Sequence, residues 1–233
     1  MPPDSRESAD GAQRARRSGG DARASAATLI LLRHGETDWN RERRLMGAAD
    51  VPLNDTGRLQ CTRVGEVLAG FGIDRIRTSP LARALESSRI VADAIGAPIE
   101  SDERLVEVRF GDWQGRTYDE IAADPQYRRY IDDPVSQAAP GGETVVDVQK
   151  RALAGLQGAC PGERILFVTH GDLIRTILCQ FLSVPLAEFR RLRIDNCGLS
   201  AVAVADGRSE VKFVNMLADP SRAWDPVHWT RQA

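Results

Sequence analysis

Two short apolar runs along the chain each lead into a histidine–glycine pair. Residues 29–32 run into Arg33-His34-Gly35, and residues 165–168 run through Thr169 into His170-Gly171. An unbroken apolar run of this length that ends at a turn is typical of a strand buried on both faces of a sheet. Either run alone would indicate only a strand followed by a polar turn. Because two of the chain's three histidines occupy this same setting, the repeat favours a shared function at the two strand ends.

The other apolar positions predict helices that alternate with strands. Apolar residues at helical spacing, with Thr56 and Ser79-Pro80 as expected helix starts, indicate helices at 56–70, 79–95, 144–156 and 173–182. Strand patterns are found at 73–78, 99–100 and, as a hairpin around Asp206-Gly207, at 200–205 and 211–215. This order predicts an α/β fold, a three-layer α/β/α sandwich with a mostly parallel mixed sheet.

Two polar segments interrupt the pattern. Residues 38–55 are polar and irregular, and residues 118–140 are polar and aromatic with two weak helices. Between the strand pattern at 99–100 and the second segment, apolar and polar residues alternate from residue 105 and lead into a glycine-rich turn that ends at residue 115. Long connections in a compact domain are often functional, so we expect these segments to border a site.

Composition restricts the domain organisation and the function classes. The first 27 of the 233 residues contain no Leu, Ile, Val, Phe, Tyr or Trp, so we expect residues 1–27 to be a disordered extension and residues 28–233 to form one domain. The extension lacks the apolar stretch of a secretory signal, and we expect a cytoplasmic protein. The net charge of −2 does not indicate a nucleic-acid or membrane-surface partner, and no apolar run approaches membrane-spanning length. The cysteines show no metal-ligand or redox spacing: Cys61, Cys160, Cys179 and Cys197.

The strand ends carry a concentration of positive charge and imidazole. Arg33 and His34 follow the first strand, His170 follows a later one, and Arg83 lies in the first turn of the helix after the strand at 73–78. If these strands are neighbours, two imidazoles and two guanidiniums converge at the edge where α/β sheets bind ligands. A phosphoryl group suits such a cluster, and a neutral histidine among arginines is a competent nucleophile toward phosphorus. Neighbouring arginines would repel a metal ion, and we expect neither a metal nor another cofactor.

Four motifs in one order give the chain a resemblance to a known family. The motifs are Leu32-Arg33-His34-Gly35-Glu36-Thr37-Asp38-Trp39-Asn40, then Thr78-Ser79-Pro80-Leu81-Ala82-Arg83-Ala84, then Leu105-Val106-Glu107 with Phe110-Gly111-Asp112-Trp113, and Val168-Thr169-His170-Gly171. With these motifs the chain resembles the histidine phosphatase superfamily, in its phosphoglycerate-mutase-like branch, over residues 28–215.

The resemblance implies a role for each matched residue. His34 would become a phosphohistidine, Arg33, Arg83 and His170 would bind and stabilise the phosphoryl group, and Glu107 would serve as acid and then base. Four further residues would line the substrate pocket: Thr37, Asn40, Gly47 and Gly171. The residue pattern alone does not select Glu107 over Glu36 or Asp112.

The sequence leaves the reaction open between hydrolysis and mutase activity, and it favours a phosphatase for a small phosphorylated metabolite. The span 116–142 is short for a closing lid, and Met46 replaces a threonine typical of mutases. Arg128-Arg129 is the contrary feature, because mutases use a similar pair against a carboxylate. Asp172 stands where relatives often carry a small or apolar residue. A phosphoglycerate mutase and, more distantly, a non-catalytic phospholigand-binding module are the alternatives, and the assembly is left open between a monomer and a homodimer.

Overall fold

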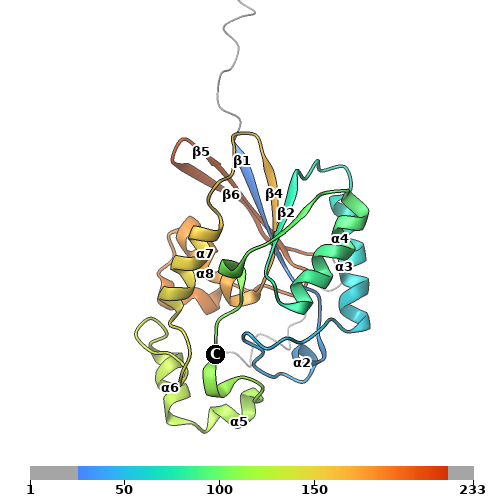
Figure 1. The fold of residues 1–233 in the computed structure, drawn as a ribbon. Helices are drawn as coiled ribbons and strands as arrows, with labels where there is room; N and C mark the ends of the chain where they lie inside the picture. Colours follow the sequence, from blue (N-terminus) through green and yellow to red (C-terminus); the bar gives the residue numbers. More distant parts are fainter. Residues whose placement is uncertain (1–25, 220–233) are drawn as a thin grey trace, which may run out of the picture.

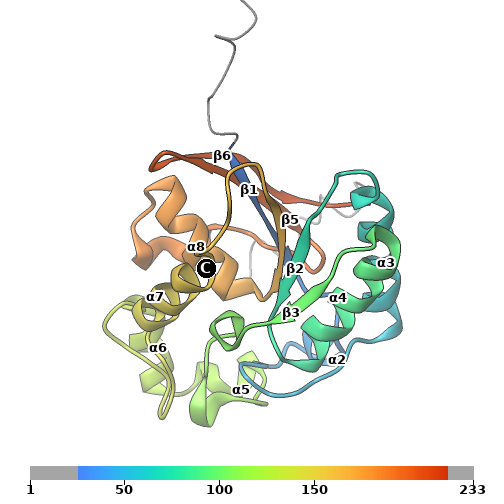
Figure 2. The same cartoon turned by 45° about the horizontal axis from the view of Figure 1, so that its top comes forward.

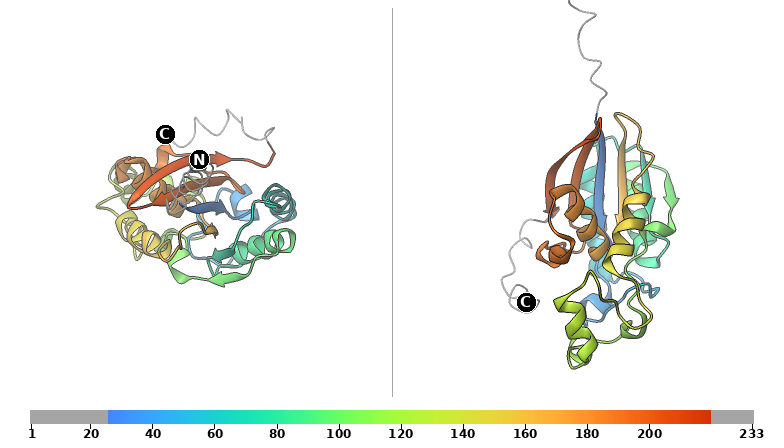
Figure 3. Two further views of the ribbon diagram at one scale, coloured as in Figure 1. Left: turned by 90° about the horizontal axis from the view of Figure 1, so that it is seen from above. Right: turned by 90° about the vertical axis from the view of Figure 1, so that its left-hand side faces the viewer.

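A six-stranded mixed sheet lies between two layers of helices in the computed structural model, which describes residues 26–219 (Figures 1 and 3). The strands are β1 (Ala27–Arg33), β2 (Arg75–Thr78), β3 (Ile99–Ser101), β4 (Arg164–Thr169), β5 (Leu199–Ala205) and β6 (Arg208–Met216). Their order is β3-β2-β4-β1-β5-β6, and the pairs from β3 to β1 are parallel whereas β5 and β6 are antiparallel to their neighbours. The predicted α/β/α sandwich is confirmed.

The helices divide between the two faces of the sheet and its carboxyl edge. They are α2 (Asp38–Arg41), α3 (Asp55–Leu68), α4 (Ala82–Ile95), α5 (Tyr118–Ala122), α6 (Pro125–Asp132), α7 (Val145–Gly155) and α8 (Gly171–Leu182), with 3-10 turns at Glu103–Leu105, Gly111–Trp113 and Leu186–Arg191. Helices α3 and α4 cover one face, and α7 and α8 cover the other (Figure 2). Helices α2, α5 and α6 lie beyond the carboxyl end of β1, at the bottom of Figure 1. Within residues 26–219, every helix is too short or too polar to cross a membrane.

Strand β1 explains why its sequence is an unbroken apolar run. Leu29 and Leu31 pack into the core under α7 and α8, whereas Ile30 and Leu32 pack into the core under α3 and α4. All four side chains are buried because successive strand residues point to opposite faces and both faces are covered. Burial of each such side chain stabilises the fold by roughly 1.5–3 kcal/mol.

The starts of α3, α4 and β1 are among those that differ from the sequence expectation. Helix α3 begins at Asp55, because the side chain of Asn54, rather than Thr56, accepts a hydrogen bond from the backbone N–H of Gly57 (2.9 Å). Helix α4 begins at Ala82 rather than at Ser79-Pro80, since the chain is still extended at Leu81. Residues 1–27 were expected to form an extension, yet Ala27 belongs to β1; residues 1–25 and the third histidine, His228, lie outside the described residues.

The alternating segment at 105–115 forms 3-10 turns and irregular chain rather than a strand. The guanidinium of Arg151 on α7 donates to the backbone carbonyls of Arg104, Val106 and Glu107, which removes the acceptors that a neighbouring strand would need. The segment therefore crosses the end of the sheet without joining it.

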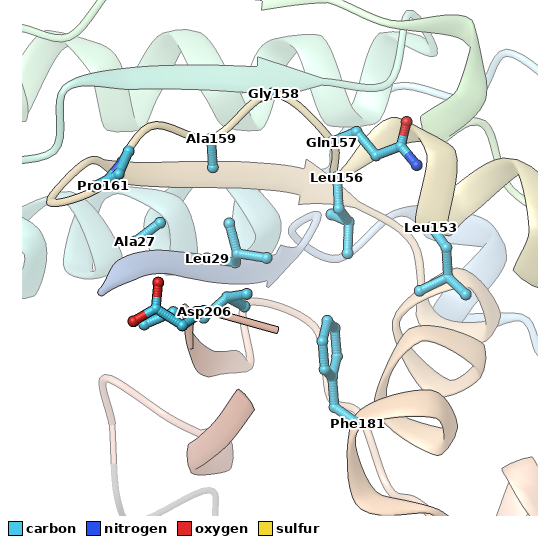
Figure 4. Close-up of a pocket in the computed structure, with 12 residues that line it drawn as sticks. Ala27, Leu29, Leu153, Leu156, Gln157, Gly158, Ala159, Pro161, Phe181 and Asp206 are labelled. Atoms are coloured by element: carbon cyan, nitrogen blue, oxygen red, sulfur yellow. The ribbon is translucent and has the colours of Figure 1, made fainter. Parts of the chain in front are cut away.

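A mainly apolar hollow of about 400 Å³ lies at the opposite edge of the sheet, beside the amino end of β1 (Figure 4). Leu29, Leu156 and Phe181 line it, and its polar side chains are Gln157 and Asp206. None of the residues expected to be catalytic borders this hollow.

Candidate active site

The structure brings together the histidines and arginines of three separate motifs. Strands β2, β4 and β1 are neighbours, so their carboxyl ends share one edge. His34 follows β1, His170 follows β4, and Arg83 lies in the first turn of α4 after β2. The two imidazole centroids are 5.1 Å apart, and all three side chains are at most 1% exposed. The two histidines and Arg83 therefore lie together, as expected if their strands are neighbours.

His34 is held as a neutral imidazole in one tautomer. Its Nδ1 lies 2.7 Å from the carbonyl oxygen of Gly35, which can only accept, so Nδ1 carries the proton and Nε2 carries a lone pair. Burial lowers the pKa of His34 well below its ordinary value, and the charges of Arg83 and Arg33 lower it further. The Nε2 lone pair accepts a hydrogen bond from Nε of Arg83 at 3.2 Å.

Arg83 links the nucleophile candidate to the loop after α2. Its Nη2 and Nη1 atoms donate to the carbonyl oxygens of Gly47 and Ala49, each at 2.7 Å. Burial lowers the pKa of Arg83 to about 10, so it stays charged at neutral pH. Gly47 has a φ of +50°, and a Cβ there would lie 2.8 Å from Oε1 of Gln114. Only glycine lets this carbonyl approach Arg83 without strain.

Arg33 and His170 each have one hydrogen-bonded nitrogen atom and one buried nitrogen atom that has no partner within residues 26–219. Nη1 of Arg33 donates to the carbonyl oxygen of Ile194 (2.8 Å), and Nε2 of His170 shares a hydrogen bond with the hydroxyl of Ser79 (2.8 Å). Within residues 26–219, the buried Nε of Arg33 and Nδ1 of His170 have no hydrogen-bond partner. Buried polar atoms are normally satisfied, so these two atoms are available to bind polar atoms of a ligand. A Cβ on Gly171 would lie 3.4 Å from Nε of Arg33, so this glycine keeps the space beside that atom open.

Thr37 and Asn40 shape the first turn of α2 beside the histidine. The side chain of Asn40 accepts from the backbone N–H of Thr37 (3.0 Å), and the Thr37 hydroxyl accepts from the N–H of Asn40 (3.2 Å). Thr37 is fully buried, and its hydroxyl also contacts Sδ of Met46 (3.2 Å). These reciprocal bonds form a capping box, so both residues hold the loop that borders His34.

Among the acidic side chains, Glu107 has the largest electrostatic effect on both Arg33 and Arg83. Its Oε1 accepts from the N–H of Val108 (3.0 Å), and its Oε2 lies 3.4 Å from the N–H of Asp172 at the start of α8. Burial raises the pKa of Glu107, and Asp172 raises it further, against the opposing effect of Arg83 and Arg33. The carboxyl group therefore keeps its proton to a higher pH than an ordinary glutamate.

The alternative acids and the arginine pair do not join this cluster. Glu36 accepts a hydrogen bond from the side chain of Asn54 (3.0 Å), and Asp112 is exposed. Arg128 and Arg129 are both exposed on α6, and Arg128 makes a 3.5 Å ion pair with Asp132.

The sequence interpretation gave no role in the site to three residues whose side chains hold His170, His34 and Gly35. Ser79, read there as a helix cap, instead holds His170. The side chain of Asn196 donates to the carbonyl of His34 (3.1 Å) and to Oδ1 of Asn40 (3.2 Å). Ser87 accepts from the N–H of Gly35 (3.1 Å). Ser79 lies inside a motif and could have been questioned, but nothing near Asn196 in the sequence connects it to residues more than 150 positions away.

Across residues 26–219, no three or more His, Cys, Asp or Glu side chains are grouped so that they could hold a metal ion. Arg33 and Arg83 beside His34 are cationic donors, which suit an oxyanion.

Residues 29–217 match the histidine phosphatase superfamily (branch 1), and the chain belongs to this family. It is 34% identical over 179 residues to a probable phosphoglycerate mutase, GpmB, of Salmonella paratyphi B, covering 75% of this chain and 83% of that one. Among solved structures, YhfR of Bacillus stearothermophilus is 37% identical with a TM-score of 0.75, covering 80% of this chain and 96% of that one. A mycobacterial glucosyl-3-phosphoglycerate phosphatase solved with VO3 is 30% identical with a TM-score of 0.70, covering 81% and 98%.

Proposed function

We propose that this chain is a metal-independent phosphatase that hydrolyses a small phosphorylated metabolite through a phosphohistidine at His34. The observation that carries the proposal is the pairing of a neutral, buried nucleophile with two buried nitrogen atoms, Arg33 Nε and His170 Nδ1, that have no hydrogen-bond partner within residues 26–219. Guanidinium and imidazole N–H groups match phosphoryl oxygens, and charge-assisted bonds of this kind are worth roughly 1.5–3 kcal/mol each. Arg33 and Arg83 supply the positive charge that a metal ion provides in other phosphatases.

In the first step, Nε2 of His34 attacks phosphorus, the N–P bond forms and the P–O bond to the leaving group breaks. In the structure, the Nε–H of Arg83 donates to Nε2 of His34. When substrate binds, this N–H donates to a phosphoryl oxygen instead, which frees the Nε2 lone pair of His34 for attack. Glu107 gives its proton to the leaving oxygen, which suits a carboxyl group whose pKa is raised. Arg33, Arg83 and His170 stabilise the charge on the transferring group.

In the second step, the Glu107 carboxylate takes a proton from water as the water oxygen attacks phosphorus. The N–P bond breaks, inorganic phosphate forms, and His34 returns to its neutral state. We propose that Thr37, Asn40, Gly47 and Gly171 line the substrate pocket, because they lie beside His34, Arg83 and Arg33.

The segment 116–142, which lies beyond the carboxyl edge of the sheet, favours hydrolysis over mutase activity. Helices α5 and α6 have five and eight residues, and Arg128 and Arg129 lie exposed rather than in the cluster. A mutase must exclude water from the phosphohistidine. Phosphoglycerate mutase remains the second candidate, because the Salmonella relative carries that name. A binding module without catalysis is disfavoured by the presence of His34, His170 and Glu107 together.

The deciding experiment compares phosphate release with the interconversion of 2- and 3-phosphoglycerate, with and without 2,3-bisphosphoglycerate as primer. We expect release from at least one phosphomonoester to outrun interconversion under both conditions, and we expect the His34→Ala variant, purified identically, to do neither. Interconversion faster than release would establish the mutase alternative instead.

A further inference from the structure

We propose that Gln60 of α3 is a positioning residue for the nucleophile: it holds the peptide group after Gly35 in the orientation that keeps the proton of His34 on Nδ1. The inference rests on the proposed function, because it explains how the attacking nitrogen, Nε2 of His34, keeps its lone pair. Gln60 lies outside the four motifs and outside the residue roles that they imply.

One peptide group connects the two side chains. Its carbonyl oxygen belongs to Gly35 and lies 2.7 Å from Nδ1 of His34. Its N–H belongs to Glu36 and donates to Oε1 of Gln60 at 3.0 Å. Because a peptide group is planar and rigid, an acceptor that fixes the direction of the N–H also fixes the direction of the carbonyl. Gln60 therefore acts on the imidazole through a single rigid unit.

The side chain of Gln60 suits this contact better than it suits packing. It is 7% exposed, and the atom that faces the N–H of Glu36 must be the amide oxygen, because a backbone N–H can only donate. Its Nε2 atom is buried and has no hydrogen-bond partner within residues 26–219. A buried amide without a full set of partners is destabilising, so packing alone would favour an apolar side chain of similar size. The acceptor function accounts for a glutamine at this position.

Two glycines bring the peptide group directly onto α3. A Cβ on Gly57 would lie 2.7 Å from the backbone nitrogen of Glu36, and a Cβ on Gly35 would lie 2.5 Å from the carbonyl oxygen of Gly57. Gln60 follows Gly57 by three residues, so both lie on the same face of α3. Ser87 of α4 holds the preceding peptide group by accepting the N–H of Gly35 at 3.1 Å. The turn is thus held by α3 and α4 together, and Gln60 supplies the contact to the peptide group in question.

The position of the proton on His34 decides whether Nε2 can attack. In a neutral imidazole one ring nitrogen carries the proton, and only the other has a lone pair to use. In the free enzyme, the N–H of Arg83 also favours the lone pair on Nε2. Once that N–H donates to the phosphoryl group, the carbonyl of Gly35 keeps the proton on Nδ1. A change at Gln60 should therefore affect kcat more than KM.

The test is the tautomer of His34 in protein labelled with ¹⁵N at histidine, read from the nitrogen chemical shifts at a pH where the imidazole is neutral. The chain has three histidines, and the spectrum of His34→Ala identifies the signals of this one. The wild type should show the proton on Nδ1 alone. Gln60→Met keeps the length of the side chain and removes the amide oxygen, so its spectrum should show the proton shared between Nδ1 and Nε2. Its kcat for an alkyl phosphate should fall roughly tenfold, with KM within about twofold of the wild type.

Two further variants separate positioning from general damage. Gln60→Glu keeps an oxygen acceptor and should retain the single tautomer and most of kcat. Gln149→Leu is the matched control: it removes the hydrogen bond from a glutamine on α7 to the carbonyl of Thr176 on α8 (2.8 Å) and should leave the tautomer of His34 unchanged.

A folded Gln60→Met enzyme in which His34 keeps the single Nδ1 tautomer would overturn the inference, even if kcat fell, because that loss would then be structural. If Gln60→Met does not fold, Gln60→Glu decides, and a mixture of tautomers there would equally overturn it. The spectra require no turnover. A wild-type enzyme that showed the expected tautomer but released no phosphate would therefore overturn the proposed function, and not the role of Gln60 in fixing the imidazole.

Discussion

The carboxyl edge of the sheet and the segment that covers it are built on different principles. At the edge, His34, Ser79, Arg83 and His170 are at most 1% exposed, and hydrogen bonds to backbone or side chains hold each of them. In the cover at 116–142, two short helices are anchored mainly by aromatic packing of Tyr127 and Tyr130 on Trp113 and by the bond from Nε1 of Trp113 to Asp124 (3.0 Å).

The difference implies that the buried edge carries out the reaction, whereas the cover determines which substrate is chosen. The buried edge recognises a phosphoryl group, which is the same in every phosphomonoester, and its residues are fixed by contacts from several elements. The cover carries exposed side chains such as Arg128, whose ion pair with Asp132 lies at the surface. Changes at the edge should therefore abolish turnover for all substrates, whereas changes in the cover should alter the choice among them.

The largest expected effect comes from removing the nucleophile. His34→Ala should lower kcat/KM by roughly 10⁴-fold or more for every substrate, since it removes the nitrogen on which the proposed intermediate forms. Steady-state kinetics with two unrelated phosphomonoesters, together with circular dichroism to confirm folding, measures this loss. A variant that retained most of its turnover would contradict the assignment of His34.

The next effect should depend on the leaving group. Glu107→Gln should cost roughly 10²–10⁴-fold with an alkyl phosphate, whose leaving oxygen must be protonated, and far less with p-nitrophenyl phosphate. The ratio of the two kcat/KM losses is the measurement. Equal losses on both substrates would move the acid role to another carboxylate, with Glu36 the first to examine.

A smaller effect should follow from releasing His170. Ser79→Ala removes its partner at Nε2, and an unsatisfied buried group costs roughly 1–3 kcal/mol, so we expect kcat to fall about tenfold. Ser88→Ala is the matched control, because Ser88 is equally buried on α4 and its hydroxyl donates to the carbonyl of Ala84 (2.8 Å). Similar kcat losses in both variants would indicate general damage to the fold.

The smallest effect is expected in the cover. Arg128 is 81% exposed and its pair with Asp132 is a surface ion pair, worth roughly 0.3–0.5 kcal/mol. Replacing Arg128 and Arg129 together by Ala should change kcat/KM for glycerol phosphate by less than about threefold. A much larger loss confined to 3-phosphoglycerate would show that the pair binds a substrate carboxylate.

The sequence was informative where structure depends on local pattern. The apolar runs predicted β1 and β4, the Asp206-Gly207 turn predicted the β5–β6 hairpin, and the stripe of Val145, Val148 and Ala152 predicted the buried face of α7. The convergence of Arg83 with the two histidines followed from parallel strands sharing an edge.

Tertiary contacts decided what the local pattern could not predict. The alternation at 105–115 is a strand signal that Arg151, more than 35 positions away, overrides by taking the carbonyl groups. The preference for Glu107 over Glu36 depended on motif position alone, because the contact of Glu36 with Asn54 and the approach of Asp172 to Glu107 both depend on the folded chain.

The central claim is that a covalent intermediate forms on His34 and is then hydrolysed. The most direct measurement is rapid mixing of enzyme with a substrate labelled in its phosphoryl group, followed by peptide mapping under neutral or alkaline conditions that preserve phosphohistidine. We predict one labelled peptide, modified at His34, in the wild type and in the slower His170→Ala variant, with the label lost to inorganic phosphate at the rate of turnover. Turnover without label on His34, or label at another residue, would contradict the account.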